Sequence, residues 1–170
     1  MNENGNEKNE FELGIIEFAG GRYDESIALF TRAFDKDPDN ALAVVSRGAA
    51  YFKQGNLDQA WSDFDRGIQI DPEYARAYHM RGLVYERLGE DEAALADFDR
   101  AIELNPEYGA AYYSRATLHT KLSNTEKAQA DIETATIIGN QNLETYMSEN
   151  NVWHTQQMRV EDALETELER

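Results

Sequence analysis

The chain has 170 residues, a formal net charge of −17 at pH 7, and 29% charged residues. Nucleic-acid binding is not expected, because affinity for the phosphate backbone depends on clusters of lysine and arginine. No cysteine is present, which excludes disulfides, thiolate metal sites and a cysteine nucleophile, and we expect a cytoplasmic protein. The polar start and the lack of a long apolar run argue against a secretory signal and against membrane insertion.

A period of 34 residues organises the chain, and positions 34 residues apart are called a column below. The three prolines form one column, Pro38, Pro72 and Pro106. Other columns hold a single residue type: Gly14, Gly48 and Gly82; Phe30, Phe64 and Phe98; Ala60, Ala94 and Ala128. A repeat of this length is typical of a stacked array in which each repeat contacts its neighbours.

Residues 1–6 are polar and are expected to form a disordered tail. The next 102 residues, 7–108, divide into three repeats of two helices each: 7–40, 41–74 and 75–108. The turns between the two helices are expected at glycines: Gly20-Gly21, Gly55-Asn56 and Gly89-Glu90. Each second helix should end before its proline, because the residue before a proline is disfavoured in the helical region.

The fourth repeat, 109–142, has its turn at Ser123-Asn124 and no closing proline. We expect its second helix to end at Gly139-Asn140, since glycine adopts the left-handed conformation that closes many helices. Residues 143–170 are expected to form a capping helix, Leu143 to Gln157, and an acidic C-terminal tail. An apolar stripe in the tail leaves two alternatives open, docking in a groove or a frayed, solvated end; the stripe consists of Val160, Leu164 and Leu168.

These columns resemble the tetratricopeptide repeat, a helix–turn–helix unit of 34 residues, over residues 7–157. The matching positions are the glycine, phenylalanine and proline columns with Tyr78 and Tyr112; Tyr51 and Tyr85; Ser26, Ala60, Ala94 and Ala128; Ala33, Ala101 and Ala135. Two departures are Gly67 in an alanine column and Asn140 in the proline column. The resemblance implies an all-α fold, a right-handed superhelix of four repeats with a C-terminal capping helix.

Two further columns change together. Three repeats carry an arginine and, 16 residues later, an aspartate, whereas the first repeat has Leu13 and Leu29 at these positions. The pairs are Arg47 with Asp63, Arg81 with Asp97, and Arg115 with Asp131. We expect each pair to be in contact within its repeat, partly buried and joined by two charge-assisted hydrogen bonds.

The resemblance also implies a concave binding face lined by the first helix of each repeat. The expected lining residues are Phe11, Phe18, Val45, Phe52, His79, Leu83, Tyr113 and Thr117, and the expected basic rim is Lys53, Arg87 and Lys121. The alternative for such an apolar stripe is core packing. Some tetratricopeptide modules clamp the carboxylate tail of chaperones with Lys, Asn and Arg in two of the lining columns, and those residues are absent from these columns here.

No catalytic pattern is present. The three histidines are scattered, and the sequence contains no phosphate loop, nucleophile elbow or metal-ligand spacing. His119 is expected to be a packing residue, because it occupies the column of Tyr51 and Tyr85. We therefore expect no enzyme, no cofactor and no metal.

The expected function is a non-enzymatic scaffold that holds a peptide or helix of a partner protein in a mostly apolar concave groove. One alternative is a self-assembling structural protein, a homo-oligomer whose C-terminal helix docks in a neighbouring copy. A subunit of an enzyme complex, with the catalytic partner elsewhere, is the other alternative.

Overall fold

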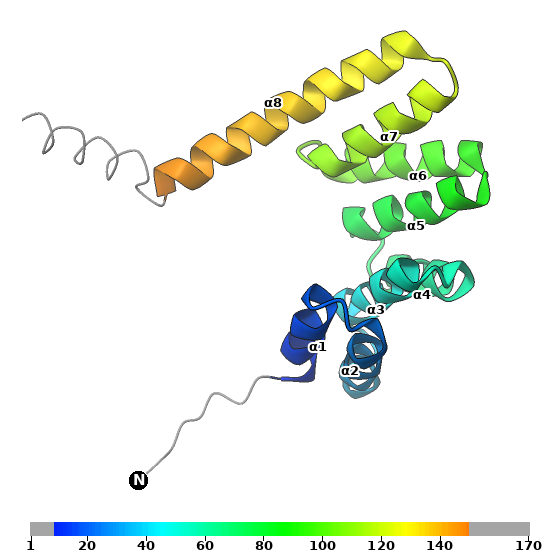
Figure 1. Ribbon diagram of the computed structural model, residues 1–170, viewed down its shortest axis with the longest axis vertical. Coiled ribbons are helices and arrows are strands. Elements are labelled where there is room, and N and C mark those ends of the chain that lie inside the picture. The colour runs from blue at the N-terminus through cyan, green and yellow to red at the C-terminus, as the bar shows by residue number, and fades with distance from the viewer. Residues whose placement is uncertain (1–8, 150–170) are drawn as a thin grey trace, which may run out of the picture.

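The computed structural model describes residues 9–149, which form α-helices and no strand (Figure 1). The helices are α1 (Glu10–Ala19), α2 (Tyr23–Lys36), α3 (Ala41–Gln54), α4 (Leu57–Ile70), α5 (Ala75–Leu88), α6 (Asp91–Leu104), α7 (Gly109–Lys121) and α8 (Thr125–Glu149). Consecutive helices pack as antiparallel pairs, and each second helix also packs against the first helix of the next pair. The result is the expected stack of four helical pairs.

The expected turns and stops are confirmed as far as α7. Gly55 and Gly89 adopt the left-handed region, with φ of 82° and 79°, and close α3 and α5. Ser123 does the same between α7 and α8, with φ of 61°. The second helices α2, α4 and α6 end two residues before their prolines.

The expected stop at Gly139-Asn140 is wrong. Helix α8 continues through both residues to Glu149 and is 25 residues long (Figure 1). Gly139 keeps a negative φ, unlike the turn glycines. A glycine weakens a helix by about 1 kcal/mol but does not remove a backbone hydrogen bond, whereas a proline does. Without a proline in this repeat, nothing forces the chain out of the helix.

This longer α8 also changes the expected cap. Residues 143–149, placed by the sequence in a separate capping helix, are the last turns of α8. The remainder of that expected helix, the acidic tail and the N-terminal tail (residues 1–6) lie outside the described residues.

The core of each of the first three pairs is a phenylalanine set against a glycine. Phe30, Phe64 and Phe98 are fully buried. A Cβ atom placed on Gly48 would lie 2.8 Å from the Phe64 ring, and the other two pairs are as tight. Only glycine allows the two helices to approach this closely.

The arginine–aspartate prediction is confirmed in all three repeats. Each arginine donates two hydrogen bonds to the paired aspartate, with N–O distances of 2.6–2.9 Å. The three aspartates are buried and the arginines are partly buried. Hydrogen bonds to Asp97 and Asp131 raise the pKa of Arg81 and of Arg115, so both guanidinium groups remain charged at any pH at which the protein folds.

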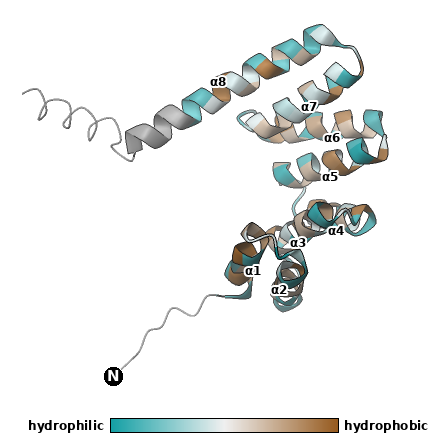
Figure 2. Ribbon diagram, in the orientation of Figure 1, coloured by the Kyte–Doolittle hydropathy of each residue, from teal (hydrophilic) through white to brown (hydrophobic). Residues whose placement is uncertain are grey.

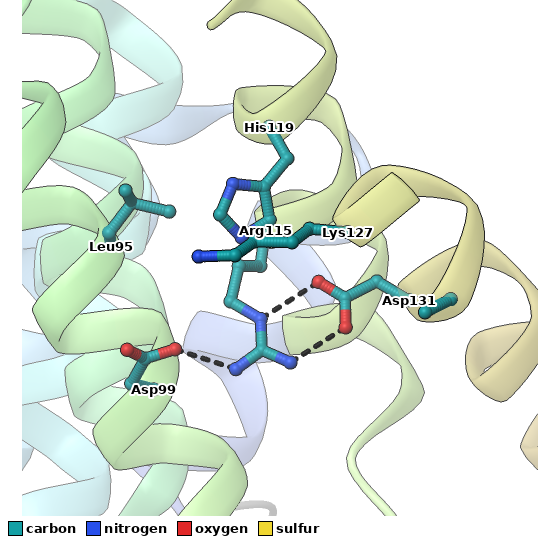
Figure 3. Close-up of a pocket in the computed structure, with 7 residues that line it drawn as sticks. Leu95, Asp99, Arg115, His119, Lys127 and Asp131 are labelled. Atoms are coloured by element: carbon teal, nitrogen blue, oxygen red, sulfur yellow. Dashed lines mark hydrogen bonds and ion pairs between the residues drawn. The ribbon is translucent and has the colours of Figure 1, made fainter. Parts of the chain in front are cut away.

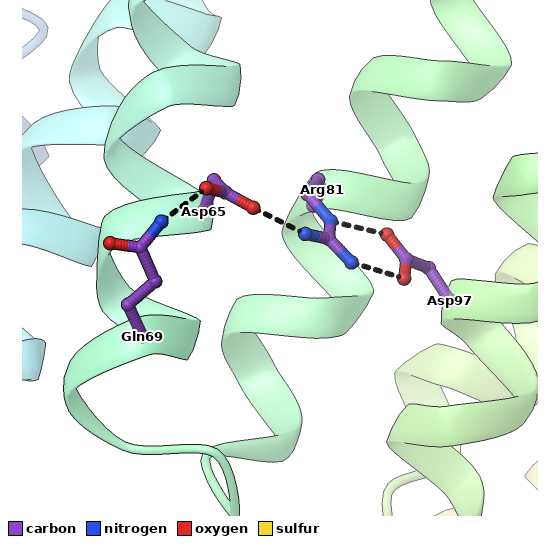
Figure 4. A network of polar contacts seen from close by, with 4 residues as sticks. All are labelled: Asp65, Gln69, Arg81 and Asp97. Atoms are coloured by element: carbon purple, nitrogen blue, oxygen red, sulfur yellow. Dashed lines mark hydrogen bonds and ion pairs between the residues drawn. The ribbon is translucent and has the colours of Figure 1, made fainter.

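Each guanidinium also reaches back to the preceding repeat, which the sequence analysis did not foresee. Nη1 of Arg81 donates to Oδ1 of Asp65 at 2.7 Å, and Asp65 in turn accepts from Gln69 (Figure 4). Arg115 reaches Asp99 in the same way at 2.6 Å. The two arginines therefore link three helices each and join neighbouring repeats.

Within residues 9–149, no helix has the length and apolar content needed to cross a bilayer.

Candidate functional site

An apolar pocket of about 260 Å³ lies between the first helices at the N-terminal end of the stack. We call it the α1–α3 pocket. It combines side chains of α1 and α3 with one from α2 and one from α5. Its lining residues are Phe11, Ile15, Phe18, Phe30, Leu42, Ser46, Ala49 and Arg76.

The α1–α3 pocket contains two of the expected groove residues, Phe11 and Phe18. The Phe11 ring lies 5.4 Å from the Phe30 ring, and Phe18 meets Tyr23 edge-on at 5.6 Å. Both rings are thus held by α2 while one side faces the pocket. Ile15, between them on α1, is exposed.

Val45 and His79 do not line an accessible groove, which corrects the expectation. Val45 is fully buried, and its Cγ2 would lie 2.4 Å from a Cβ atom on Gly67 of α4. Gly67, which stands where the other repeats have alanine, thus leaves room for the Val45 side chain. Val45 and His79 are both buried, so these two side chains belong to the core.

His79 is 6% exposed and is bonded at both ring nitrogens. Nδ1 lies 3.0 Å from the Tyr108 hydroxyl and Nε2 lies 2.9 Å from Oγ of Ser114. Burial lowers the pKa of His79 to about 4, and the nearby positive charge of Arg76 adds to this effect. His79 is therefore a neutral, structural histidine that ties α5 to the next repeat.

The remaining expected groove residues lie along the stack and apart from the pocket. Phe52 and Leu83 are half-buried, and Thr117 is exposed. Tyr113 is 65% exposed, the largest exposure among the large apolar side chains of residues 9–142. Tyr113 is thus a free aromatic surface on α7, whereas Phe52 also contributes to the core around Phe64.

The expected basic rim has three different environments. The guanidinium carbon of Arg87 lies 4.9 Å from the centre of the Phe52 ring, a cation–π arrangement. Nζ of Lys121 forms an ion pair with Asp91 at 2.6 Å. Lys53 is exposed. Arg87 therefore covers an aromatic ring of the groove, while Lys121 is already neutralised.

Arg76 was missed by the sequence analysis. It is exposed, lines the α1–α3 pocket, and forms no ion pair with the carboxylates of residues 9–142. Its column also holds Lys8, Leu42 and Ala110. The available signal was the second basic residue in this column.

A second cavity, of about 450 Å³, lies among α6, α7 and α8 (Figure 3). It is bordered by Leu95, Asp99, Arg115, His119, Lys127, Ala130 and Asp131. The Arg115 guanidinium is held by Asp99 on one side and Asp131 on the other. His119 is buried, as expected for a packing residue, and it replaces the larger tyrosine of this column.

The side chains of residues 9–142 contain no group of three or more His, Asp or Glu placed to hold a metal ion. The buried aspartates are neutralised by arginines, and His79 is bonded at both nitrogens.

Comparison with known proteins identifies the repeat. Three family models described as tetratricopeptide repeat match residues 11–75, 48–113 and 98–130. A comparison with curated proteins gives no match. Many solved structures are similar, and their fold confirms the expected all-α, right-handed superhelix of helix–turn–helix repeats.

Among these structures is the first tetratricopeptide domain of Spaghetti (RPAP3) bound to the HSP90 peptide SRMEEVD. It is 31% identical, with a TM-score of 0.64, and the match covers 67% of this chain and 90% of that one. The Thermus thermophilus protein TTC0263 is 25% identical, with a TM-score of 0.70 and coverages of 77% and 73%. MamA, at 24% identity and a TM-score of 0.65 over 86% and 85%, shares the fold. By the family models and the RPAP3 match together, the chain belongs to the tetratricopeptide repeat family.

Proposed function

We propose that the protein is a non-enzymatic scaffold that binds a segment of a partner protein on its concave face. The α1–α3 pocket is the observation that carries this proposal. Its volume suits one or two aliphatic side chains, and Phe11, Ile15 and Phe18 supply an apolar wall on rigid helices. An apolar side chain of the ligand would anchor there.

Charge favours an acidic ligand segment beside that anchor. Arg76 lies at the pocket without a carboxylate partner among the described residues, and Arg87 and Lys53 are further along the first helices. These cations contrast with the net charge of −17 of the whole chain. We propose a peptide in which an aliphatic residue is followed or preceded by a carboxylate.

The RPAP3 domain gives independent support for this ligand class. That domain is bound to SRMEEVD, a peptide in which methionine and valine adjoin acidic residues. The clamp residues that some family members use for chaperone tails are missing from two columns of this chain. Arg76 belongs to a third column, so an acidic peptide can still find a cation at the pocket.

The test uses fluorescence anisotropy with labelled SRMEEVD and with SRMEEAD, in which the valine is shortened. A random peptide library, selected on the full chain, extends the test to other sequences. Two pocket variants, Ile15→Glu and Arg76→Glu, are compared with a control, Arg66→Glu, which changes an exposed arginine on α4.

We expect SRMEEVD to bind more tightly than SRMEEAD, and the library to enrich aliphatic–acidic sequences. Each pocket variant should weaken binding at least about tenfold, since each removes an anchor and adds a repulsive charge. Arg66→Glu should bind like the wild type. The proposal is overturned if neither peptide nor library binds, or if the pocket variants bind as tightly as Arg66→Glu.

A further inference from the structure

Apolar residues occur on the helices at both ends of the stack, α1 and α8 (Figure 2), and some of their side chains are exposed. On α1, at one end, Leu13 is 38% exposed and Ile16 is 40% exposed. On α8, at the opposite end, Ile132 is 48% exposed and Ile137 is 50% exposed. These residues lie outside the α1–α3 pocket.

Ile16 at one end and Ile132 at the other occupy the two sides of an interface that the chain already forms three times. The column of Ile16 continues as Ala50, Val84 and Leu118, all fully buried because the preceding second helix covers them. On the other side, Phe64 packs in one cluster with Val84, and Phe98 packs in one cluster with Leu118. Among residues 9–149, no helix precedes α1 to cover Ile16.

Helix α8 carries the other side of this interface. Ile132 occupies the column of Phe30, Phe64 and Phe98, which are buried against the glycine of their own repeat, and Phe64 and Phe98 also pack against the first helix of the next repeat. Within residues 9–149, no following helix covers α8 (Figure 1). An α1 helix set on α8 would therefore bring Ile16 against Ile132, as Leu118 meets Phe98.

We propose that a second copy of this chain stacks its α1 on α8 and continues the array from one molecule to the next. The occupant of the α8 face is thus a second copy, and the contact is heterologous, with different surfaces on the two molecules. Such a contact leaves a free end after each addition, so it builds short head-to-tail chains. It leaves the α1–α3 pocket of each copy outside the contact.

The charged columns predict that this contact is weaker than an internal one. Within the chain, Arg81 and Arg115 reach back to Asp65 and Asp99. In the stacked contact, the carboxylate column continues as Glu133, but the arginine column begins with Leu13. The ion link is therefore missing, and two copies of charge −17 repel each other. Added salt should strengthen the association by screening this repulsion.

The test is sedimentation velocity of the full chain over a range of concentration and salt. Ile16→Glu blocks one end of the stack, and Ile132→Glu blocks the other. We expect each variant alone to be monomeric, with the dissociation constant raised at least about tenfold. An equimolar mixture should recover a dimer and nothing larger, because each variant keeps one intact end.

Ile15→Glu is the matched control, since it changes the neighbouring isoleucine, which faces the α1–α3 pocket. It should associate like the wild type, whereas Ile16→Glu should keep the peptide affinity of the wild type. The two proposals can therefore fail separately. A gain of function completes the test: Leu13→Arg with Leu29→Asp rebuilds the ion network and should tighten association at least about tenfold.

Three results would each overturn the stacking proposal. One is a wild type that remains monomeric at every concentration and salt. Another is a mixture of the two blocked variants that stays monomeric. The third is loss of association in Ile132→Glu but not in Ile16→Glu, which would indicate a symmetric contact between two α8 helices.

Discussion

At the scale of single residues, each buried arginine is shared between two repeats. The Arg81 guanidinium is held by both oxygens of Asp97 and by one oxygen of Asp65. Asp97 is 6% exposed, so its charge depends on the arginine for compensation. The first repeat shows the alternative solution, since Leu13 and Leu29 occupy the corresponding positions.

We therefore expect Asp97→Ala to destabilise the protein more than Arg81→Leu combined with Asp97→Leu. Removing one partner of a buried ion pair costs about 3–5 kcal/mol, whereas apolar replacement of both partners is often close to neutral. Urea unfolding of the wild type and the variants, arranged as a double-mutant cycle, measures this coupling. A coupling energy near zero would contradict the role given to the pair.

His79 makes stability depend on pH. Its pKa is about 4 in the folded chain and near 6.5 in the unfolded chain, so the unfolded state binds more protons between these values. The free energy of unfolding should therefore fall as the pH drops from about 6.5 to 4, by about 3 kcal/mol for this residue.

The measurement compares urea unfolding of the wild type and His79→Gln between pH 4 and 7. Glutamine can still bond to Tyr108 or Ser114 but does not titrate. The free energy of unfolding of the variant should depend less steeply on pH. Subtracting the variant's curve from the wild-type curve removes the contribution of the carboxylates, which the two proteins share. Identical slopes would show that His79 is not the titrating group.

At the scale of the helices, α8 shows the difference between a residue that ends a helix and one that only weakens it. The first three second helices end before a proline, while α8 passes through Gly139. The backbone of Gly139 is helical, and a Cβ atom placed there would meet nothing within 4 Å. Gly89, by contrast, closes α5 with φ of 79°.

Gly139→Ala should thus stabilise the protein by about 0.5–1 kcal/mol, because alanine restricts the unfolded chain and fits the helix. Gly89→Ala is the matched control and should destabilise it by more than about 1 kcal/mol, since alanine is strained at positive φ. Thermal unfolding followed by circular dichroism measures both. A destabilised Gly139→Ala protein would indicate that α8 ends at residue 139 in solution.

The helices and their pairing could be predicted because proline and glycine act locally. Pro38, Pro72 and Pro106 end helices wherever they stand, and the column pattern fixes the partner of each helix. The end of α8 could not be predicted in the same way, since Gly139 permits a stop without requiring one. Packing and hydrogen bonds along the helix decide the outcome.

The binding face was harder to predict because a column does not have the same environment in every repeat. Phe11, Val45, His79 and Tyr113 share one column, yet Val45 is buried against Gly67 and Tyr113 is exposed. Arg76 was overlooked because it stands at the start of α5, outside the columns expected to line the groove. Single side chains, and not the repeat pattern, thus determine where the pocket lies.

At the scale of the whole molecule, stability is expected to be lowest toward the ends of the stack. In repeat proteins the free energy of unfolding is approximately the sum of the stabilities of the single repeats and of the contacts between neighbouring repeats. The contacts of α5 and α7 with the preceding repeat contain an ion link, whereas Arg47 reaches only the Thr31 hydroxyl, at 3.3 Å. The first repeat also lacks an arginine–aspartate pair of its own.

Backbone amides of α1 should accordingly exchange with solvent at least about tenfold faster than those in the middle of α5 and α6, because local opening is easiest where fewest contacts are lost. Hydrogen exchange followed by mass spectrometry, in dilute solution where copies do not associate, gives the rates. Leu13→Arg with Leu29→Asp should slow exchange in α1 and α2, since it supplies the missing pair. Equal rates along the wild-type stack would mean that the four repeats unfold as one cooperative unit, in which the ion links do not set local stability.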